Sequence, residues 1–305
     1  MPSNQNPLGA LPARFRRQRV LIVGCGDIGM RIVRALRGRV QLMALSSTGD
    51  RADALHAQGV RVLRGDLDQP RSLRRIAGLA THVIHLAPPA AQGWADNRTR
   101  DLVAALRRRA PPLSLVYGST SGVYGDCAGA LIAETRMTRA DTPRARRRVD
   151  AEHWIRFFGR GAGVAASILR IPGIYAPDRT GGTPRQRLLA GTPVLRAEDD
   201  VYTNHIHADD LARACVAALW RARAQRIYNV NDDTQLKMGD YFDLVADLFD
   251  LPRPPRLPRA MAAAQLPLGL LSFMGESRRM DNTRLKRELK LVLRYPTVTQ
   301  GLQPA

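Results

Sequence analysis

The sequence predicts an α/β fold in which helices cover both faces of a parallel sheet, the doubly wound arrangement. Short runs of β-branched and aliphatic residues alternate with amphipathic stretches up to about residue 249. The first such pair is joined by a glycine-rich turn within residues 20–38. Strands and helices that alternate at this spacing form parallel sheets with right-handed crossovers. The 305 residues suffice for one large domain with an appendage, or for two domains.

Composition narrows the class of protein. No apolar run approaches the roughly 18 residues that identify a membrane span, and the best candidate, 261–275, reads as a buried or lid-like segment. Residues 1–18 carry Pro, Asn and Arg without periodicity, so we expect a flexible basic tail and no secretory signal peptide. The three cysteines show neither metal-ligand spacing nor a disulfide framework. We therefore expect a cytoplasmic protein without a metal site.

The net charge of +20 comes from 44 Arg and only 3 Lys against 27 acidic residues. An excess of this size is typical of proteins that bind nucleic acid. The arginines are spread over nearly every segment, however, and no zinc-finger spacing or other nucleic-acid recognition motif occurs. We therefore expect arginines on solvated faces and a small-molecule substrate, with no nucleic acid or membrane partner. A homodimer is compatible with the sequence.

The glycine-rich turn has the pattern G-x-G-x-x-G. A predicted strand over 20–23 precedes it, and a predicted amphipathic helix over 28–36 follows it. In this context Gly24 makes the tight turn, Gly26 lets the backbone approach a pyrophosphate, and Gly29 lets the helix pack against the strand. The helix N-terminus adds free N–H groups and a partial positive charge. We therefore predict dinucleotide binding in a Rossmann fold, rather than a βα turn without a ligand. The expected pyrophosphate contacts are Gly24, Gly26, Asp27, Ile28 and Gly29.

The end of the second predicted strand, 40–45, bears on the choice of cofactor. An acidic residue at this point binds the ribose 2′-hydroxyl of NAD, whereas its absence beside an Arg suits the 2′-phosphate of NADP. Here the strand is followed by Ser46 and Ser47, and Arg51 is placed to give a charge-assisted contact. We therefore expect NADP in preference to NAD; the alternative is an ordinary polar loop.

The third and fourth predicted strands, 60–63 and 81–87, supply further cofactor contacts. Asp66 and its neighbour Leu67 follow the third strand, where ligands bind in open α/β sheets. Asp66 can accept a hydrogen bond from adenine or cap a helix that starts near Pro70. At the end of the fourth strand, the pyrophosphate and ribose are expected beside Leu86, Ala87 and Pro88.

The remaining elements follow from the same alternation. Helices are predicted over 52–58, 97–109, 151–158, 211–223 and 238–249, and strands over 113–117, 164–170 and 226–230. His85, on an apolar strand, is expected to be a core residue. Asp209 or Asp210 is expected to cap the helix over 211–223.

Seven motifs together resemble the extended short-chain dehydrogenase/reductase superfamily, which contains sugar-nucleotide epimerases and dehydratases. They are GCGDIG (24–29), GDL (65–67), HLAPP (85–89), STSGVYG (119–125), ILRIPGIYAP (168–177), NHIHADDLA (204–212) and YNVND (228–232). The chain looks most like an atypical branch of NAD(P)-binding members. The resemblance implies a dinucleotide-binding domain over 19–175 and a small substrate domain over 176–305, with 203–231 returning to the first domain.

The resemblance also implies catalytic positions. Members use a Ser or Thr together with a Tyr-x-x-x-Lys pair, and here the hydroxyl residue matches Thr120. Alignment on Glu152 places Arg144 at the Tyr position and Arg148 at the Lys position, so the sequence departs from the pattern at both. Arg148 retains the charge that holds the ribose, but a guanidinium cannot replace the phenol as a proton donor. Tyr124 is the candidate substitute, with a packing tyrosine as its alternative role.

The second half of the chain contributes less specific expectations. By the resemblance, Pro172 and Ile174 pass the nicotinamide carboxamide. The Gly-rich segment 179–186 is expected to be a mobile flap over the substrate. Three arginines are able to bind an acidic substrate group or else are solvated charges: Arg170, Arg185 and Arg187.

Two functions are compatible with these features. The first is an NAD(P)-dependent oxidoreductase or epimerase with a non-standard active site. The second is a non-catalytic NADP-binding protein that senses redox state or regulates a partner. The retained Thr120 favours the first, and the loss of the Tyr-x-x-x-Lys pair favours the second.

Overall fold

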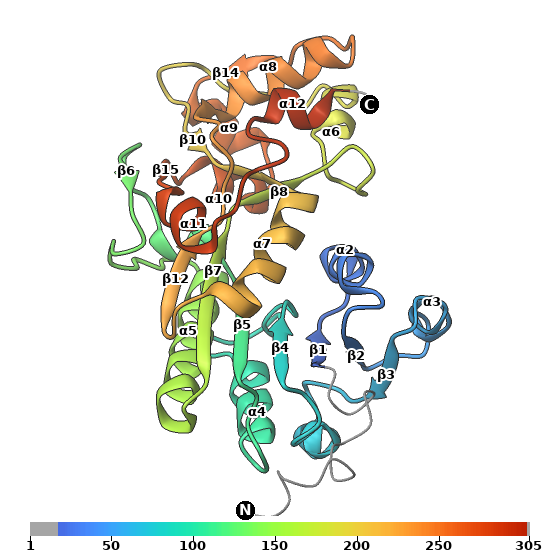
Figure 1. The fold of residues 1–305 in the computed structure, drawn as a ribbon. Helices are drawn as coiled ribbons and strands as arrows, with labels where there is room; N and C mark the ends of the chain where they lie inside the picture. The colour runs from blue at the N-terminus through green and yellow to red at the C-terminus, as the bar shows by residue number, and fades with distance from the viewer. Residues whose placement is uncertain (1–17, 304–305) are drawn as a thin grey trace, which may run out of the picture.

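The computed structural model describes residues 18–303, and a seven-stranded parallel sheet forms its centre (Figure 1). The strand order is β12-β7-β5-β4-β1-β2-β3, so the order reverses between β1 and β4. Its strands are β1 (Arg19–Val23), β2 (Gln41–Ser46), β3 (Arg61–Arg64), β4 (His82–His85), β5 (Ser114–Thr120), β7 (Ala165–Ile171) and β12 (Arg226–Asn229). In open sheets a ligand binds beside the carboxyl ends of the strands at this reversal. The predicted doubly wound α/β fold is confirmed.

The two faces of the sheet are covered by different helices because side chains alternate along a strand. Val20 and Ile22 of β1 belong to one core, and Leu21 and Val23 to the other. The first core packs against α2 (Asp27–Leu36), α3 (Ala52–Ala57), α7 (Ala208–Arg221) and α11 (Thr283–Leu289). The second packs against η3 (Pro70–Ile76), α4 (Asn97–Leu106) and α5 (Pro143–Ala162). The element after Pro70 is a 3₁₀ helix.

Helix α5 is longer than the sequence predicts. The prediction began at residue 151, whereas the helix begins at Pro143, after Thr142 accepts a hydrogen bond from the Ala145 N–H at 3.2 Å. The missed turns are rich in arginine and carry little apolar spacing, so the hydrophobic pattern does not extend into them. Gly163, with φ +64°, ends the helix in the left-handed conformation.

The predicted cap of α7 is wrong. The Nδ1 atom of His207 accepts the hydrogen bond from the Asp209 N–H, at 3.2 Å. The fully buried Asp210 instead fixes the C-terminal segment, because its carboxylate accepts hydrogen bonds from the backbone N–H groups of Arg294 and Tyr295 at 2.9 and 2.8 Å. His85 is a buried core residue as expected, paired with the Thr99 hydroxyl at 2.9 Å.

A third core lies above the sheet in Figure 1 and is built from the C-terminal part of the chain. Its helices are α6 (Arg185–Leu189), α8 (Met238–Leu248), α9 (Arg259–Gln265), α10 (Leu268–Met274) and α12 (Val298–Leu302). Four short two-stranded sheets complete the fold: β8 (Gly173–Tyr175) with β11 (His205–His207), β9 (Val194–Leu195) with β14 (Arg256–Leu257), β10 (Tyr202–Thr203) with β13 (Leu236–Lys237), and β6 (Leu131–Ile132) with β15 (Arg279–Met280).

Not all of the C-terminal part belongs to this third core. Leu285 and Leu289 of α11 are fully buried in the first core of the large sheet, which the expected domain division did not include. Of the segment 261–275, Ala262 and Met274 are buried and Met261 is exposed. The predicted basic tail lies almost wholly outside the described residues. Within residues 18–303, no helix combines the length and apolar character needed to cross a bilayer.

The docking of the C-terminal segment on Asp210 can be tested by Asp210→Asn. The amide replaces one acceptor with a donor and removes the charge that pairs with Arg213. We expect the free energy of unfolding to fall by about 1–3 kcal/mol in urea denaturation, the usual cost of an unsatisfied buried polar group. The control is Asp247→Asn, which breaks an exposed pair with Arg253 and should leave the midpoint unchanged. Equal midpoints for both variants would contradict this role.

Candidate functional site

Two cavities meet beside the carboxyl ends of the sheet strands. The glycine cavity, about 270 Å³, includes the glycine turn, Gly118–Thr120 and Arg148 in its lining. The large cavity, about 520 Å³, lies between Thr120 and the third core and includes Tyr202, Tyr241 and Phe242. Both cavities are lined by Thr120, Arg144, Pro172, Ile174 and Arg179. Molecules bound in the two cavities would therefore contact each other at these residues.

The glycine turn has the geometry of a phosphate-binding loop. Gly24 has φ +86°, and a Cβ atom there would lie 2.3 Å from the backbone nitrogen of Ala87. A Cβ on Gly29 would lie 3.0 Å from Cys25 Sγ, so α2 packs closely against the turn. At Gly26 the nearest atom would be 3.8 Å away, which leaves this backbone accessible. Helix α2 has no side-chain cap, so its first N–H groups remain available to an anion.

The first turn of α2 also carries a carboxylate, Asp27, whose charge is compensated. Asp27 pairs with Arg31 and Arg179, each at 3.2 Å. The buried Arg31 also pairs with Asp178 at 2.7 Å and with Asp209 at 2.5 Å. This network joins α2 to α7 and to the segment around residues 176–184. Without these guanidinium groups Asp27 would repel phosphates at the helix N-terminus.

The predicted cofactor residues divide into two groups. Eight line the glycine cavity: Gly24, Gly26, Asp27, Ile28, Gly29, Leu86, Pro172 and Ile174. The others lie outside its lining, at the end of β2 or in the segments after β2, β3 and β4: Ser46, Ser47, Arg51, Asp66, Leu67, Ala87 and Pro88.

The polar side chains near the ends of β2 and β3 already form hydrogen bonds within the protein. Arg51 reaches back to the turn, where its Nη1 donates to the Cys25 carbonyl at 3.4 Å. The Ser46 hydroxyl donates to the Thr48 carbonyl at 2.7 Å. Asp66 accepts from the Asp68 N–H at 2.9 Å and does not cap η3, so the capping alternative is wrong.

Cys25, inside the glycine turn, is a buried filler. Burial raises the pKa of its thiol to about 11, although Arg51 opposes the shift. The thiol therefore stays protonated near pH 7 and is a poor nucleophile. The cysteines at 25, 127 and 215 are all free and buried. Within residues 18–303, no group of three His, Cys, Asp or Glu side chains is placed to hold a metal ion.

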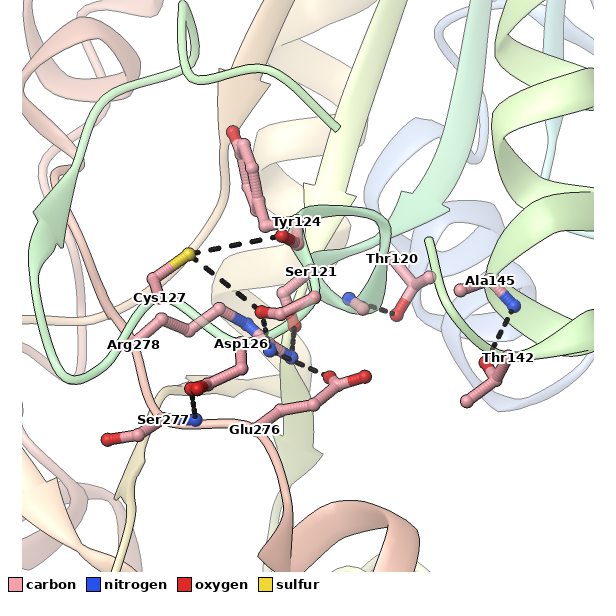
Figure 2. Close-up of polar contacts among 12 residues, drawn as sticks. Thr120, Ser121, Tyr124, Asp126, Cys127, Thr142, Ala145, Glu276, Ser277 and Arg278 are labelled. Carbon is pink, nitrogen blue, oxygen red and sulfur yellow. Dashed lines mark hydrogen bonds and ion pairs between the residues drawn. The ribbon is translucent and has the colours of Figure 1, made fainter. Parts of the chain in front are cut away.

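Thr120 and Arg148 lie at the junction of sheet and cavities. The Thr120 hydroxyl, at the end of β5, accepts from the Gly122 N–H at 3.3 Å (Figure 2). Its own hydrogen remains available to a ligand in either cavity. Arg148 Nη1 donates to the Tyr117 hydroxyl at 3.0 Å and to the Gly118 carbonyl at 2.8 Å. Arg148 is thereby held rigidly in the lining of the glycine cavity.

The structure gives Tyr124 the alternative role, that of a packing tyrosine. Its side chain is fully buried, lines neither cavity, and donates its hydroxyl hydrogen to Asn229 Oδ1 at 2.6 Å. Burial raises the pKa of its phenol. A phenol enclosed in this way has no contact with a ligand in either cavity. The expectation of Tyr124 as a proton donor is therefore corrected: its position lies in the core beside the site.

The Ser119 hydroxyl also forms a hydrogen bond inside the protein. Its hydroxyl donates to Glu152 Oε1 at 2.6 Å, and the same carboxylate accepts from Arg170 Nε and Nη2 at 3.1 and 2.7 Å. All three side chains are buried. Arg170 is therefore a structural partner of Glu152 and does not meet a substrate.

Sequence reasoning missed Glu276, which lines the large cavity close to Thr120 in space (Figure 2). Glu276 pairs with Arg278 Nη1 at 2.7 Å, and Arg278 also donates to the Gly125 carbonyl at 2.8 Å. No local pattern could have found this contact, because the two segments are separated by about 150 residues in the chain. Arg144, at the position of the family tyrosine, is exposed and lines both cavities.

The close approach at Gly24 can be tested by Gly24→Ala. The added Cβ overlaps the Ala87 backbone, and the positive φ strains any L-residue. We expect a loss of about 2–5 kcal/mol in the free energy of unfolding, from overpacking together with backbone strain. The control is Gly38→Ala, with φ +77° and no atom within 4 Å, which should cost only about 1–2 kcal/mol. A Gly24 variant as stable as the Gly38 variant would show that the approach is not required.

Known proteins were compared with the sequence and the structure. No curated protein matches the sequence. Solved structures that resemble it include a functionally unknown conserved protein from Silicibacter pomeroyi, at 27% identity and TM-score 0.77 over 94% of this chain and 97% of that one. A UDP-glucose 4-epimerase from Thermotoga maritima, solved with UDP-glucose, has 18% identity and TM-score 0.77 over 94% and 96%. A UDP-glucuronic acid 4-epimerase from Bacillus cereus, in complex with NAD, has 18% identity and TM-score 0.73 over 94% and 96%.

These likenesses agree with the observed fold. The sequence profile of the NAD dependent epimerase/dehydratase family matches residues 20–231, which cover most of the large sheet and its helices. The chain therefore belongs to the NAD dependent epimerase/dehydratase family.

Proposed function

We propose that the protein is an NAD(P)-dependent enzyme of the epimerase, dehydratase or reductase type whose active site lacks the Tyr-x-x-x-Lys pair. The observation that carries this proposal is the junction of the two cavities at Thr120 and Arg144. A dinucleotide in the glycine cavity and a small molecule in the large cavity would meet there. Solved structures with this fold include one in complex with NAD and one with UDP-glucose, which supports the same division.

The chain offers contacts along the whole length of a dinucleotide. The first turn of α2 suits the pyrophosphate, and Pro172 and Ile174 suit the nicotinamide end because they line both cavities. Asp66 and Leu67 are proposed for the adenine, and Leu86, Ala87 and Pro88 for the adjoining ribose and phosphates. When bound, the nicotinamide ring gives or accepts a hydride.

Thr120 and Arg148 are proposed to act on the substrate and the ribose respectively. Thr120 can donate its hydroxyl hydrogen to a substrate oxygen, since its oxygen already accepts from Gly122. Arg148 is fixed by Tyr117 and Gly118 and can present its remaining N–H groups to ribose hydroxyls. Arg144 stabilises negative charge on a substrate oxygen, although it cannot supply a proton. Glu276 places a carboxylate in the lining of the large cavity, where it pairs with Arg278.

The presence of Arg144 where the resemblance predicts a tyrosine favours a second candidate, a non-catalytic NADP-binding redox sensor. The same measurements separate the two functions. NADPH and NADH binding is followed by fluorescence, and turnover is then followed at 340 nm with a panel of carbonyl substrates. Binding with turnover supports the enzyme, binding without any turnover supports the sensor, and no binding would refute both. The cytoplasmic location and a homodimer remain predictions.

Thr120→Val tests the catalytic role. We expect kcat to fall by about 10²-fold, the effect of removing one hydrogen-bond donor to the reacting oxygen, with unchanged affinity for the cofactor. The control is Thr138→Val, a partly exposed threonine outside both cavities, which should leave kcat unchanged. A Thr120 variant with full kcat would exclude this hydroxyl from the chemistry.

Arg51→Ala tests the preference for NADP. Loss of a charge-assisted hydrogen bond to the 2′-phosphate should raise the dissociation constant of NADPH by about 10–100-fold. NADH lacks this phosphate and should bind equally well to both proteins. Arg61→Ala is the control, because this exposed arginine starts β3 and therefore lies toward the amino ends of the parallel strands, away from the end of β2 that precedes Arg51. If NADPH and NADH weakened equally, the preference would have another origin.

A further inference from the structure

Arg187, on α6, is a cation in the large cavity without a counterion. Its guanidinium carbon lies 4.4 Å from the centroid of the Phe242 ring. The Nε and Nη2 atoms are buried and have no hydrogen-bond partner among residues 18–303. No carboxylate in this part of the chain forms an ion pair with it, and it lines the large cavity.

Two other guanidinium groups in the lining of the large cavity have carboxylate partners. Arg179 pairs with Asp27, and Arg278 pairs with Glu276. Burial lowers the pKa of Arg187, and no neighbouring carboxylate opposes this shift. A partly buried charge without a partner costs free energy that an ion pair would offset. The guanidinium of Arg187, which has no carboxylate partner among residues 18–303, is therefore suited to an anion from outside the chain.

Two neutral polar groups in the same lining also lack partners. The Oγ1 atom of Thr203 and the Nδ1 atom of His205 are buried without hydrogen bonds within the described chain. Burial lowers the pKa of His205 to about 4, so this imidazole is uncharged near pH 7. Buried polar atoms are nearly always hydrogen-bonded in native proteins. Their joint presence indicates a polar ligand in the large cavity.

We propose that Arg187 is an anion-binding subsite of the large cavity and that the substrate carries a carboxylate or phosphate group bound there. The proposal rests on the proposed function in that the ligand is taken to be the substrate. The guanidinium lies against the Phe242 ring, and its planar set of N–H donors suits two-point binding of either group. Of the three arginines that the sequence offered for an acidic substrate, Arg170 is paired with Glu152 and Arg185 is exposed outside the cavity lining.

The test uses inorganic phosphate and malonate as probes in titration calorimetry. Phosphate can also bind at the glycine turn, so the measured quantity is the difference between wild type and Arg187→Gln, which keeps most of the stem over Phe242. We expect Arg187→Gln to weaken at least one anion by tenfold or more. Arg185→Gln, on the same helix, is the matched control and should match wild type. The anion that depends on Arg187 identifies the group, phosphate or carboxylate.

Equal affinity of wild type and Arg187→Gln for both probes would overturn the subsite, as would no saturable binding of either. If Arg187→Gln does not fold, Arg187→Lys is used in its place. Because an ammonium binds as a point charge, we expect this variant to bind the anion about fivefold more weakly or worse. Unchanged anion affinity in Arg187→Lys would likewise overturn the subsite. NADPH binding is measured on every sample. Anion binding that does not depend on Arg187, together with intact NADPH binding, overturns this inference alone. Arg187-dependent anion binding without NADPH binding overturns the proposed function alone.

Discussion

The buried ion pair between Glu152 and Arg170 sets the position of the helix that lines the site. Arg170 lies on β7 and Glu152 on α5, and Ser119 of β5 donates to the same carboxylate. The helix is thereby fixed to two neighbouring strands at one register. Residues four and eight positions before Glu152 lie on the same helix face. They are Arg148 and Arg144, and both line the glycine cavity.

This ion pair matters more for register than for stability. Desolvation of two buried charges cancels much of their attraction, so an apolar pair could stabilise the same contact equally well. An apolar pair, however, would tolerate small shifts of α5 along the sheet. The bidentate geometry, with two hydrogen bonds from Arg170 and a third from Ser119, permits one arrangement. The side chains at the junction of the cavities depend on that single arrangement.

Local signals explain which parts of the structure the sequence could predict. The strand, turn and helix around Gly24 are encoded within twenty residues, and the apolar alternation that follows placed the strands of the sheet close to their observed positions. The start of α5 was missed because its cap, Thr142, precedes arginines without apolar spacing. The roles of Tyr124 and Glu276 depend on partners that are far away in the chain. Such contacts leave no pattern in a single sequence.

Arg144 stands where the resemblance predicts the family tyrosine, and the two side chains support different chemistry. A phenol moves a proton, whereas a guanidinium holds its proton and stabilises negative charge. Arg144 and Arg148 both line the glycine cavity, and Arg187 adds a positive charge to the large cavity. A field of this sign favours an anionic substrate and an oxyanion that forms on it. In the proposed enzyme these guanidinium groups would stabilise negative charge on the substrate, whereas Tyr124 is buried in the core and lines neither cavity.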